Sequence, residues 1–217
     1  MTALPRILPL PDLLVDQIAA GEVVERPANV VKELVENALD AGARSIEVHL
    51  ARGGIDRNEV VDDGHGIHRD DFPLAIARHA TSKLRRWDDL GRLATYGFRG
   101  EALASIASVA DFRLESRTAD AAAGTRLRAS NGVVVEDGEP VAMPPGTRVV
   151  AERLFDRLPA RRKFLRAPAT ELALCARMLR ELGVAVPGRR LVLVHEGRRV
   201  VKLFAEQPLE RFREAVG

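Results

Sequence analysis

The spacing of apolar residues changes along this chain of 217 residues, and the change limits the folds that it can adopt. Between residues 27 and 41 apolar side chains recur every three or four positions, as in an amphipathic helix. From about Phe112 to Phe155 the pattern becomes one of strands and turns, with Asn131-Gly132 as a strong hairpin signal. Helices followed by hairpins favour an α+β two-layer sandwich with a mostly antiparallel, mixed sheet. A doubly wound nucleotide fold would alternate strands and helices more strictly.

Start, stop and turn signals predict the individual elements. We expect helices at residues 13–20, 27–42, 71–79, 101–109, 170–182 and 208–216. Strands are expected at 46–50, 191–194 and 200–204, with another short strand that ends at 60–61. The polar segment from 81 to 97 is typical of a mobile loop or lid.

Composition excludes several classes of protein. Cys175 is the single cysteine, so no intrachain disulfide can form and a reducing compartment fits best. Arg, Asp or Glu interrupts every long apolar stretch, and the N-terminus lacks the layout of a signal peptide. We therefore expect a cytoplasmic protein with no membrane span.

A polar stripe lies opposite the apolar side of the helix expected at 27–42. Asn29, Glu33, Asn37 and Asp40 align at helical spacing, and Glu33 and Asn37 are one turn apart. One interpretation is a solvated outer face. Asn is a poor helix former, however, and an exposed position would more often carry Glu, Lys or Arg. The other interpretation is a site where the carboxylate takes a proton from water and the amide oxygen ligates Mg²⁺.

A glycine-rich turn led by carboxylates, residues 62–66, follows the second expected strand. Gly64 and Gly66 allow positive φ or close approach to a ligand. Asp62, at the end of the strand, can accept a hydrogen bond from an exocyclic amine such as that of adenine. A tight surface turn is the alternative, since Asp-Gly is a common turn signal. A metal site at His65 has weak support, because His65 lacks spaced partners.

A second pair of glycines precedes the helix expected at 101–109. A helix N-terminus with glycines presents N–H groups and a favourable dipole to an anion. No P-loop motif occurs anywhere in the chain, so any triphosphate is held in another way. The alternative is a loop with a capping glycine. The residues concerned are Thr81, Ser82, Lys83, Gly97, Phe98, Arg99 and Gly100.

Taken together, these segments resemble one protein family. The strings are Ile18-Ala-Ala-Gly-Glu-Val-Val-Glu-Arg-Pro-Ala, Val31-Lys-Glu-Leu-Val-Glu-Asn-Ala-Leu-Asp-Ala-Gly-Ala43, Ala80-Thr-Ser-Lys83, Gly97-Phe-Arg-Gly-Glu-Ala-Leu-Ala-Ser-Ile106 and Pro159-Ala-Arg-Arg-Lys-Phe-Leu165. They are similar to the MutL family of DNA mismatch-repair proteins. That family belongs to the GHKL ATPases, with gyrase B subunits, a heat-shock chaperone class and sensor histidine kinases. The resemblance covers almost the whole chain and implies the GHKL (Bergerat) fold.

The resemblance also implies roles for the site residues. Glu33 would be the general base for the attacking water, and Asn37 would ligate the Mg²⁺ that bridges the phosphates of ATP. Asp62 would read the adenine amino group, with Thr147 beside the base. The remaining residues would admit the base (Gly64 and Gly66) or form the lid and phosphate cradle (Thr81, Ser82, Lys83, Gly97, Phe98, Arg99 and Gly100).

Two positions depart from the family pattern. Asp63 stands where Asn is usual, and an additional carboxylate near a polyanion is expected to weaken nucleotide binding. Arg157 stands where Asn is common, which leaves the hydrogen bonding of its loop open.

We expect three regions: an N-terminal arm with a first helix at 1–20, an ATP-binding domain at 21–206, and the start of a truncated second domain at 207–217. In the family, a lysine on that second domain reaches the γ-phosphate. The chain is therefore expected to be a fragment that hydrolyses ATP weakly.

The leading interpretation of function is Mg²⁺-dependent ATP binding and hydrolysis, acting as a conformational switch in DNA mismatch repair. In the family, ATP orders the lid and the arm, and two N-terminal regions then form a homodimer. The expected partners are mismatch-recognition and other repair proteins. The alternatives are an ATP-gated, non-catalytic scaffold and a sensor-kinase-type catalytic domain.

DNA binding is a further hypothesis, carried by basic clusters at 161–166 and 189–199. If they bind DNA, the binding should be led by phosphate contacts, tolerant of sequence and weakened by salt. Without interleaved aromatic residues, base stacking is not expected. Solvated basic faces are the alternative.

Overall fold

The computed structural model describes residues 15, 20, 21, 23–77, 80, 100–204 and 206–216. In this part of the chain eight strands form one sheet in the order β5-β4-β3-β6-β2-β1-β7-β8. The strands are β1 (Ser45–Ala51), β2 (Arg57–Asp62), β3 (Asp111–Arg117), β4 (Gly124–Ser130), β5 (Val133–Val141), β6 (Gly146–Glu152), β7 (Arg190–His195) and β8 (Arg198–Leu203). The α-helices are α2 (Pro27–Asp40), α3 (Phe72–Ala75), α4 (Ala102–Val109), α5 (Pro159–Arg162), α6 (Pro168–Ala185) and α7 (Pro208–Val216), and the 3-10 turns are η1 (Arg52–Gly54) and η2 (Arg69–Asp71).

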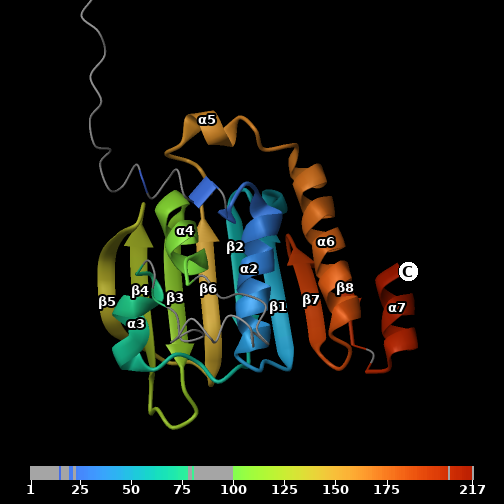
Figure 1. Cartoon of the computed structure of the whole chain (residues 1–217), viewed down its shortest axis with the longest axis horizontal. Helices are drawn as coiled ribbons and strands as arrows, with labels where there is room; N and C mark the ends of the chain where they lie inside the picture. Colours follow the sequence, from blue (N-terminus) through green and yellow to red (C-terminus); the bar gives the residue numbers. More distant parts are fainter. Residues whose placement is uncertain are drawn as a thin grey trace, which may run out of the picture.

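The sheet is mixed, and helices cover one of its faces. Among the described strands only β1 and β7 pair in parallel, and every other neighbouring pair is antiparallel. Helices α2, α4 and α6 lie on the same side of the sheet (Figure 1). These observations confirm the expected α+β two-layer architecture.

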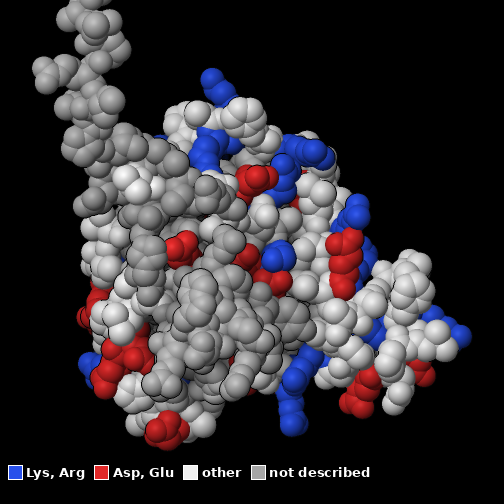
Figure 2. Space-filling model, in the orientation of Figure 1, with Lys and Arg blue, Asp and Glu red and all other residues white. Residues whose placement is uncertain are grey.

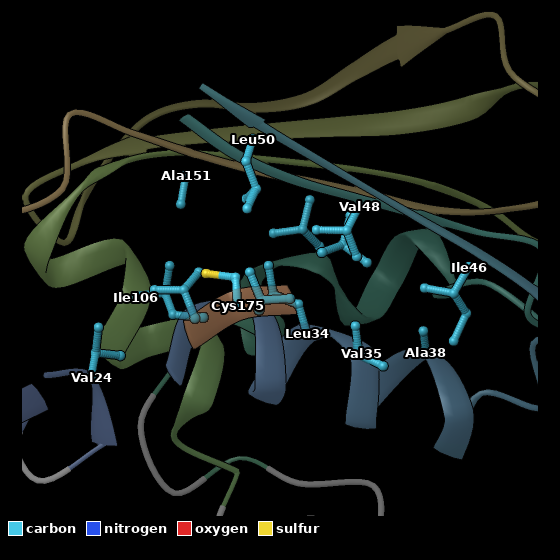
Figure 3. Packing of buried hydrophobic residues seen from close by; sticks show 14 of the residues in the cluster. Val24, Leu34, Val35, Ala38, Ile46, Val48, Leu50, Ile106, Ala151 and Cys175 are labelled. Atoms are coloured by element: carbon cyan, nitrogen blue, oxygen red, sulfur yellow. The ribbon is translucent and has the colours of Figure 1, made fainter. Parts of the chain in front are cut away.

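Helix α2 supplies the centre of the core between the two layers. Its side chains Leu34, Val35 and Ala38 point towards the strands, where Val48 and Leu50 meet them (Figure 3). All five are buried. Burying a side chain the size of Val or Leu contributes about 1.5–3 kcal/mol. The apolar stripe read from the sequence therefore fixes which side of α2 is left for the polar residues.

Ion pairs occupy sheet positions that alternate with the core positions. Glu115 on β3 is 4% exposed and lies 3.0 Å from Arg126 Nε and 3.4 Å from Arg148 Nη1. Arg57 on β2 contacts Glu59 at 2.9 Å and Glu152 at 2.6 Å. Because strand side chains alternate between faces, these residues lie on the face turned away from α2.

The structure differs from the expected elements in two places. The helix expected at 71–79 is only η2 followed by the four-residue α3, and of the apolar residues Phe72 and Leu74 only Phe72 is buried. A helix without a continuous buried face has little to stabilise it in water. The short helix α5 was not expected. The lid at 81–97 and most of the helix at 13–20 lie outside the described residues.

The helices expected at 27–42, 101–109, 170–182 and 208–216 are confirmed to within three residues at each end. In the described ranges no helix combines the length and the apolar character that crossing a membrane requires.

Candidate functional site

The polar stripe of α2 divides into a capping residue and a pair of site candidates. Asn29 Oδ1 accepts a hydrogen bond from the backbone N–H of Arg26 at 3.1 Å, so Asn29 caps the start of the helix. Glu33 and Asn37 follow at four-residue spacing and are partly exposed. The Lys32 ammonium lies 3.8 Å from Glu33 Oε1 and 3.1 Å from the Glu36 carboxylate. A cation therefore stands beside the candidate base, which the sequence analysis did not foresee.

The glycine turn after β2 is fixed to the end of this stripe. Ala41 is the next residue after Glu33 and Asn37 at the same four-residue spacing, and its carbonyl oxygen accepts a hydrogen bond from His65 N at 3.0 Å. Gly64 packs so closely that a Cβ atom at that position would lie 2.8 Å from Ala41 Cβ. The structure therefore brings the 62–66 turn to the C-terminal end of α2, on the line of Glu33 and Asn37.

Asp62 is a largely buried carboxylate at the end of β2. Burial raises its pKa from 3.8 to about 6, and the neighbouring charge of Asp63 acts in the same direction. The backbone N–H groups of Gly64 and Thr147 and the charge of His65 oppose this rise in pKa. The Gly64 N–H donates to Asp62 Oδ1 at 2.8 Å. A carboxyl group held in this way near neutral pH is typical of functional sites.

Thr147 stands between two other polar residues in the sheet register. On β6 it pairs with Asp62 of β2 on one side and with Ser116 of β3 on the other. Gly146 before it has φ 130°, and a Cβ atom there would lie 2.1 Å from Asp62 O. Only glycine lets β6 approach the Asp62 backbone this closely.

Gly66 is the second position where the backbone requires glycine. Its φ is 76°, and a Cβ atom would lie 2.3 Å from Arg117 O. The chain therefore passes from β2 directly against the end of β3. There Ile67 N donates to Ser116 Oγ at 2.8 Å.

Ser116 is a buried residue of this region that the sequence analysis missed. It is 1% exposed, and its hydroxyl contacts the Gly146 carbonyl and the Thr147 hydroxyl, both at 2.9 Å. A signal was present in the sequence: Ser116 follows Phe112 and Leu114 on the inward face of β3, as a small polar group where an apolar one is expected.

Asp63 has a definite place in the turn. Its Oδ1 accepts hydrogen bonds from the backbone N–H groups of Arg44 at 2.7 Å and Ser45 at 2.8 Å. These bonds tie the turn to the segment between α2 and β1, and the oxygen of an asparagine would accept them equally. Its effect on nucleotide affinity stays a prediction. Arg157 is exposed, and no side-chain hydrogen bond involves it among the described residues.

The predicted lid residues Thr81, Ser82, Lys83, Gly97, Phe98 and Arg99 lie outside the described part of the chain. Gly100 is described: its φ is 65°, and it comes two residues before α4. Helix α4 contacts α2 and leads through Ala110 into β3. The glycine expected before this helix therefore does adopt a conformation that favours glycine.

Two cavities border the region without enclosing the candidates. One, of about 460 Å³, lies between η2 and the β3–β5 strands, and its lining includes Ile67, Ser116 and Thr125. The other, of about 390 Å³, lies between the start of α2 and α6. Neither is lined by Glu33 or Asn37. Within the described ranges no three His, Cys, Asp or Glu side chains converge on a metal position.

Known proteins resemble this chain in sequence. Residues 25–143 match the family described as histidine kinase-, DNA gyrase B- and HSP90-like ATPase. The chain is 51% identical over 98% of its length to the DNA mismatch repair protein MutL of Neisseria meningitidis. It is 56% identical over 88% of its length to MutL of Sphingopyxis alaskensis. The chain spans about a third of the length of these curated relatives, 32% and 31%.

A solved structure of a related protein has a similar fold. The Aquifex aeolicus MutL ATPase domain complexed with ADP is 34% identical, with a TM-score of 0.73, over 89% of this chain and 70% of that one. Together with the arrangement of α2, the 62–66 turn and β6, these matches place the chain in the MutL family of DNA mismatch-repair proteins, within its GHKL ATPase region.

Proposed function

We propose that this chain binds ATP with Mg²⁺ and hydrolyses it, and that the nucleotide cycle is a conformational switch in DNA mismatch repair. One observation carries the proposal: the stripe of Glu33 and Asn37 ends at Ala41, against which the turn that follows the largely buried Asp62 is held. The purine reader and the hydrolytic residues would then lie along one side of a single helix, from Glu33 in its middle to the turn at its C-terminal end. The Aquifex aeolicus MutL ATPase domain, which is complexed with ADP, supports nucleotide binding by this chain.

Each residue has a role that follows from its chemistry. Asp62 accepts a hydrogen bond from the purine amine, and Thr147 lies beside it. Gly64 and Gly66 would shape the turn beside the base, since a Cβ atom at either position would meet Ala41 or Arg117. Glu33 orients a water molecule and takes its proton. Gly100 and α4, with Thr81, Ser82, Lys83, Gly97, Phe98 and Arg99, surround the phosphates through N–H groups and positive charge.

The residues present fit a magnesium ion shared with phosphates. Mg²⁺ usually takes one or two protein oxygens and completes its shell with phosphate and water oxygens. Asn37 offers such an amide oxygen, one turn from Glu33. When bound, the ion would neutralise charge that develops on the phosphates during transfer to water. The protein's own contribution is to position water and phosphate, which dominates phosphoryl transfer.

A calorimetric titration tests the proposal. Residues 1–217 should bind ADP and ATP, with ATP bound more tightly when Mg²⁺ is present. Hydrolysis should be weak in this chain and faster in a longer protein that includes the next domain and its lysine. Failure of both proteins to bind any adenine nucleotide would remove the proposal. Equal turnover in the two would remove only the need for the second-domain lysine.

We also propose the regions and partners that the family implies. Residues 1–20 would form the arm, 21–206 the ATP-binding domain and 207–217 the start of the next domain. ATP would order the arm and the lid, and two N-terminal regions would dimerise and recruit repair proteins in the cytoplasm. Within this proposal, an ATP-gated scaffold differs only in lacking turnover, so the hydrolysis rate of the longer protein separates the two.

A second proposed function is DNA binding at the edge of the molecule that carries α5. Lys and Arg side chains gather there (Figure 2). The Arg161 guanidinium lies over the Phe155 ring, 5.0 Å from its centroid, and Arg162 forms an ion pair with Asp156. Lys163 and Arg166 are exposed and have no carboxylate partner among the described residues. Within the cluster at 161–166, these two side chains are therefore the ones available for phosphates.

Phe164 changes one part of the sequence-based interpretation. This aromatic residue lies next to Lys163 and is 81% exposed. The cluster therefore does contain an interleaved ring on which an unpaired base can stack.

DNA affinity should fall by at least about tenfold between 50 and 200 mM salt, because each phosphate contact releases a counterion. The double variant Lys163→Gln with Arg166→Gln should lower the slope of log affinity against log salt by about 2. Fluorescence anisotropy with a short labelled DNA measures both. Arg128→Gln, which removes one of the two arginine partners of Glu136 on the opposite face of the sheet, is the matched control and should leave the slope unchanged. An affinity that does not respond to salt would contradict this role.

A further inference from the structure

The Ser116 hydroxyl is surrounded by three polar atoms and by almost no solvent. Ile67 N lies at 2.8 Å, Gly146 O at 2.9 Å and Thr147 Oγ1 at 2.9 Å, and Ser116 is 1% exposed. A serine hydroxyl has one proton and two acceptor lone pairs, so three contacts use all of its capacity.

Counting protons fixes the direction of each bond. Ile67 N–H can only donate, and the Gly146 carbonyl can only accept. The Ser116 proton is therefore committed to Gly146 O. The remaining bond requires the Thr147 hydroxyl to donate to Ser116 Oγ. Thr147 thereby uses its only proton and presents lone pairs alone to any group on its other side.

Asp62, which pairs with Thr147 across β2 and β6, also presents only hydrogen-bond acceptors. Its carboxylate accepts from the Gly64 N–H at 2.8 Å and has no proton to give when ionised. Two adjacent groups that only accept hydrogen bonds suit a ligand edge that brings N–H donors. They repel an edge that brings a carbonyl oxygen, since a buried acceptor facing another acceptor loses its hydrogen bond.

We propose that Ser116 is a positioning residue that determines nucleotide specificity: it holds the Thr147 hydroxyl as an acceptor and so selects 6-aminopurine over 6-oxopurine nucleotides. The inference rests on the proposed placing of the purine 6-position against Asp62 and Thr147. Ser116 itself does not touch the nucleotide. Its effect passes through the direction of one hydroxyl proton.

The test uses three nucleotides whose purine rings carry different groups at position 6: ATP, inosine triphosphate, whose 6-oxo group is accompanied by a proton on N1, and purine riboside triphosphate. The wild-type full-length protein should prefer ATP over the inosine nucleotide. Ser116→Ala frees the Thr147 proton to meet a 6-oxo group, so the ratio of the two affinities should fall about tenfold or more. The unsubstituted purine nucleotide has no group at position 6, so wild type and Ser116→Ala should bind it with nearly the same affinity. Ser116→Thr keeps the hydroxyl and should restore the wild-type ratio.

A double-mutant cycle separates specificity from structure, and it remains informative where Ser116→Ala alone lowers stability. Thr147→Val removes the hydroxyl that Ser116 orients. In that background Ser116→Thr should leave the ratio unchanged, and Ser116→Ala should have no further effect on it. A folded Ser116→Ala protein that loses affinity for all three nucleotides equally would overturn the inference. If the wild type binds none of them, the proposed function fails instead.

Discussion

The Glu33→Ala variant of the longer protein is expected to hydrolyse ATP about 10²–10⁴-fold more slowly while still binding it. Alanine removes the carboxylate that would take the proton of the attacking water. It leaves the Asp62 turn intact, because that turn is held by Ala41, Arg44 and Ser45. The fold should persist too, since Lys32 keeps its contact with Glu36 at 3.1 Å. Phosphate release at saturating ATP measures turnover, and calorimetry measures binding.

Glu181→Ala is the matched control for this experiment. It makes the same chemical change on a helix, at an exposed residue whose partner is Arg177 at 2.7 Å. An exposed pair of this kind contributes between about 0 and 1 kcal/mol, so both turnover and binding should remain close to wild type. Unchanged hydrolysis in Glu33→Ala would exclude Glu33 as the base. Loss of binding together with turnover would show that Glu33 holds the nucleotide rather than the water.

The pattern of apolar residues predicted the layers but not the order of the strands. Helical spacing in α2 identified its buried face, and Asn131-Gly132 identified the β4–β5 hairpin, because both signals are local. The position of β6 between β3 and β2 joins segments that lie far apart in the sequence. Periodicity states which way a side chain faces and says nothing about which strand lies beside it. The parallel pairing of β1 with β7 was hidden for the same reason.

The candidate site could be proposed from the sequence where its chemistry is carried by one segment. Glu33 with Asn37 and Asp62 with its glycines were found as separate local patterns, and the resemblance joined them. Ser116 was missed because its role depends on three segments that meet only in the folded sheet. Asp63 was read as a charge near phosphate, whereas its carboxylate receives two backbone N–H groups that no spacing in the sequence indicates.

Asp62→Asn is expected to weaken ATP binding by about tenfold to 10²-fold and at the same time to stabilise the nucleotide-free protein. The asparagine oxygen would take the Gly64 N–H that Asp62 Oδ1 now accepts, which turns the NH₂ group towards the purine amine. Two donors would then face each other. Asp63→Asn is the matched control, because its oxygen keeps both bonds to Arg44 and Ser45, so ATP affinity should not fall.

The gain in stability should depend on pH, and the pKa of Asp62 sets the window. Burial raises that pKa from 3.8 to about 6, so the folded protein favours the neutral carboxyl. This preference stabilises the folded protein fully below about pH 4, and the stabilisation is lost as pH rises through 6. The free energy of unfolding falls by about 3 kcal/mol across this range. Asparagine has no charge to bury. Asp62→Asn should therefore unfold at a temperature about 6–12 °C above wild type at pH 8 and show no such gain at pH 4.

The same titration should appear in binding. Below pH 6 wild-type Asp62 becomes protonated and loses its role as a pure acceptor, so ATP affinity should decrease as the pH is lowered from 7 to 5. The Asp62→Asn protein should lack that component of the pH dependence. A variant that binds ATP as well as wild type at pH 7.5 would place the purine amine elsewhere. A variant that is less stable than wild type at pH 8 would mean that the ionised carboxylate is stabilised by groups other than Gly64, Thr147 and His65.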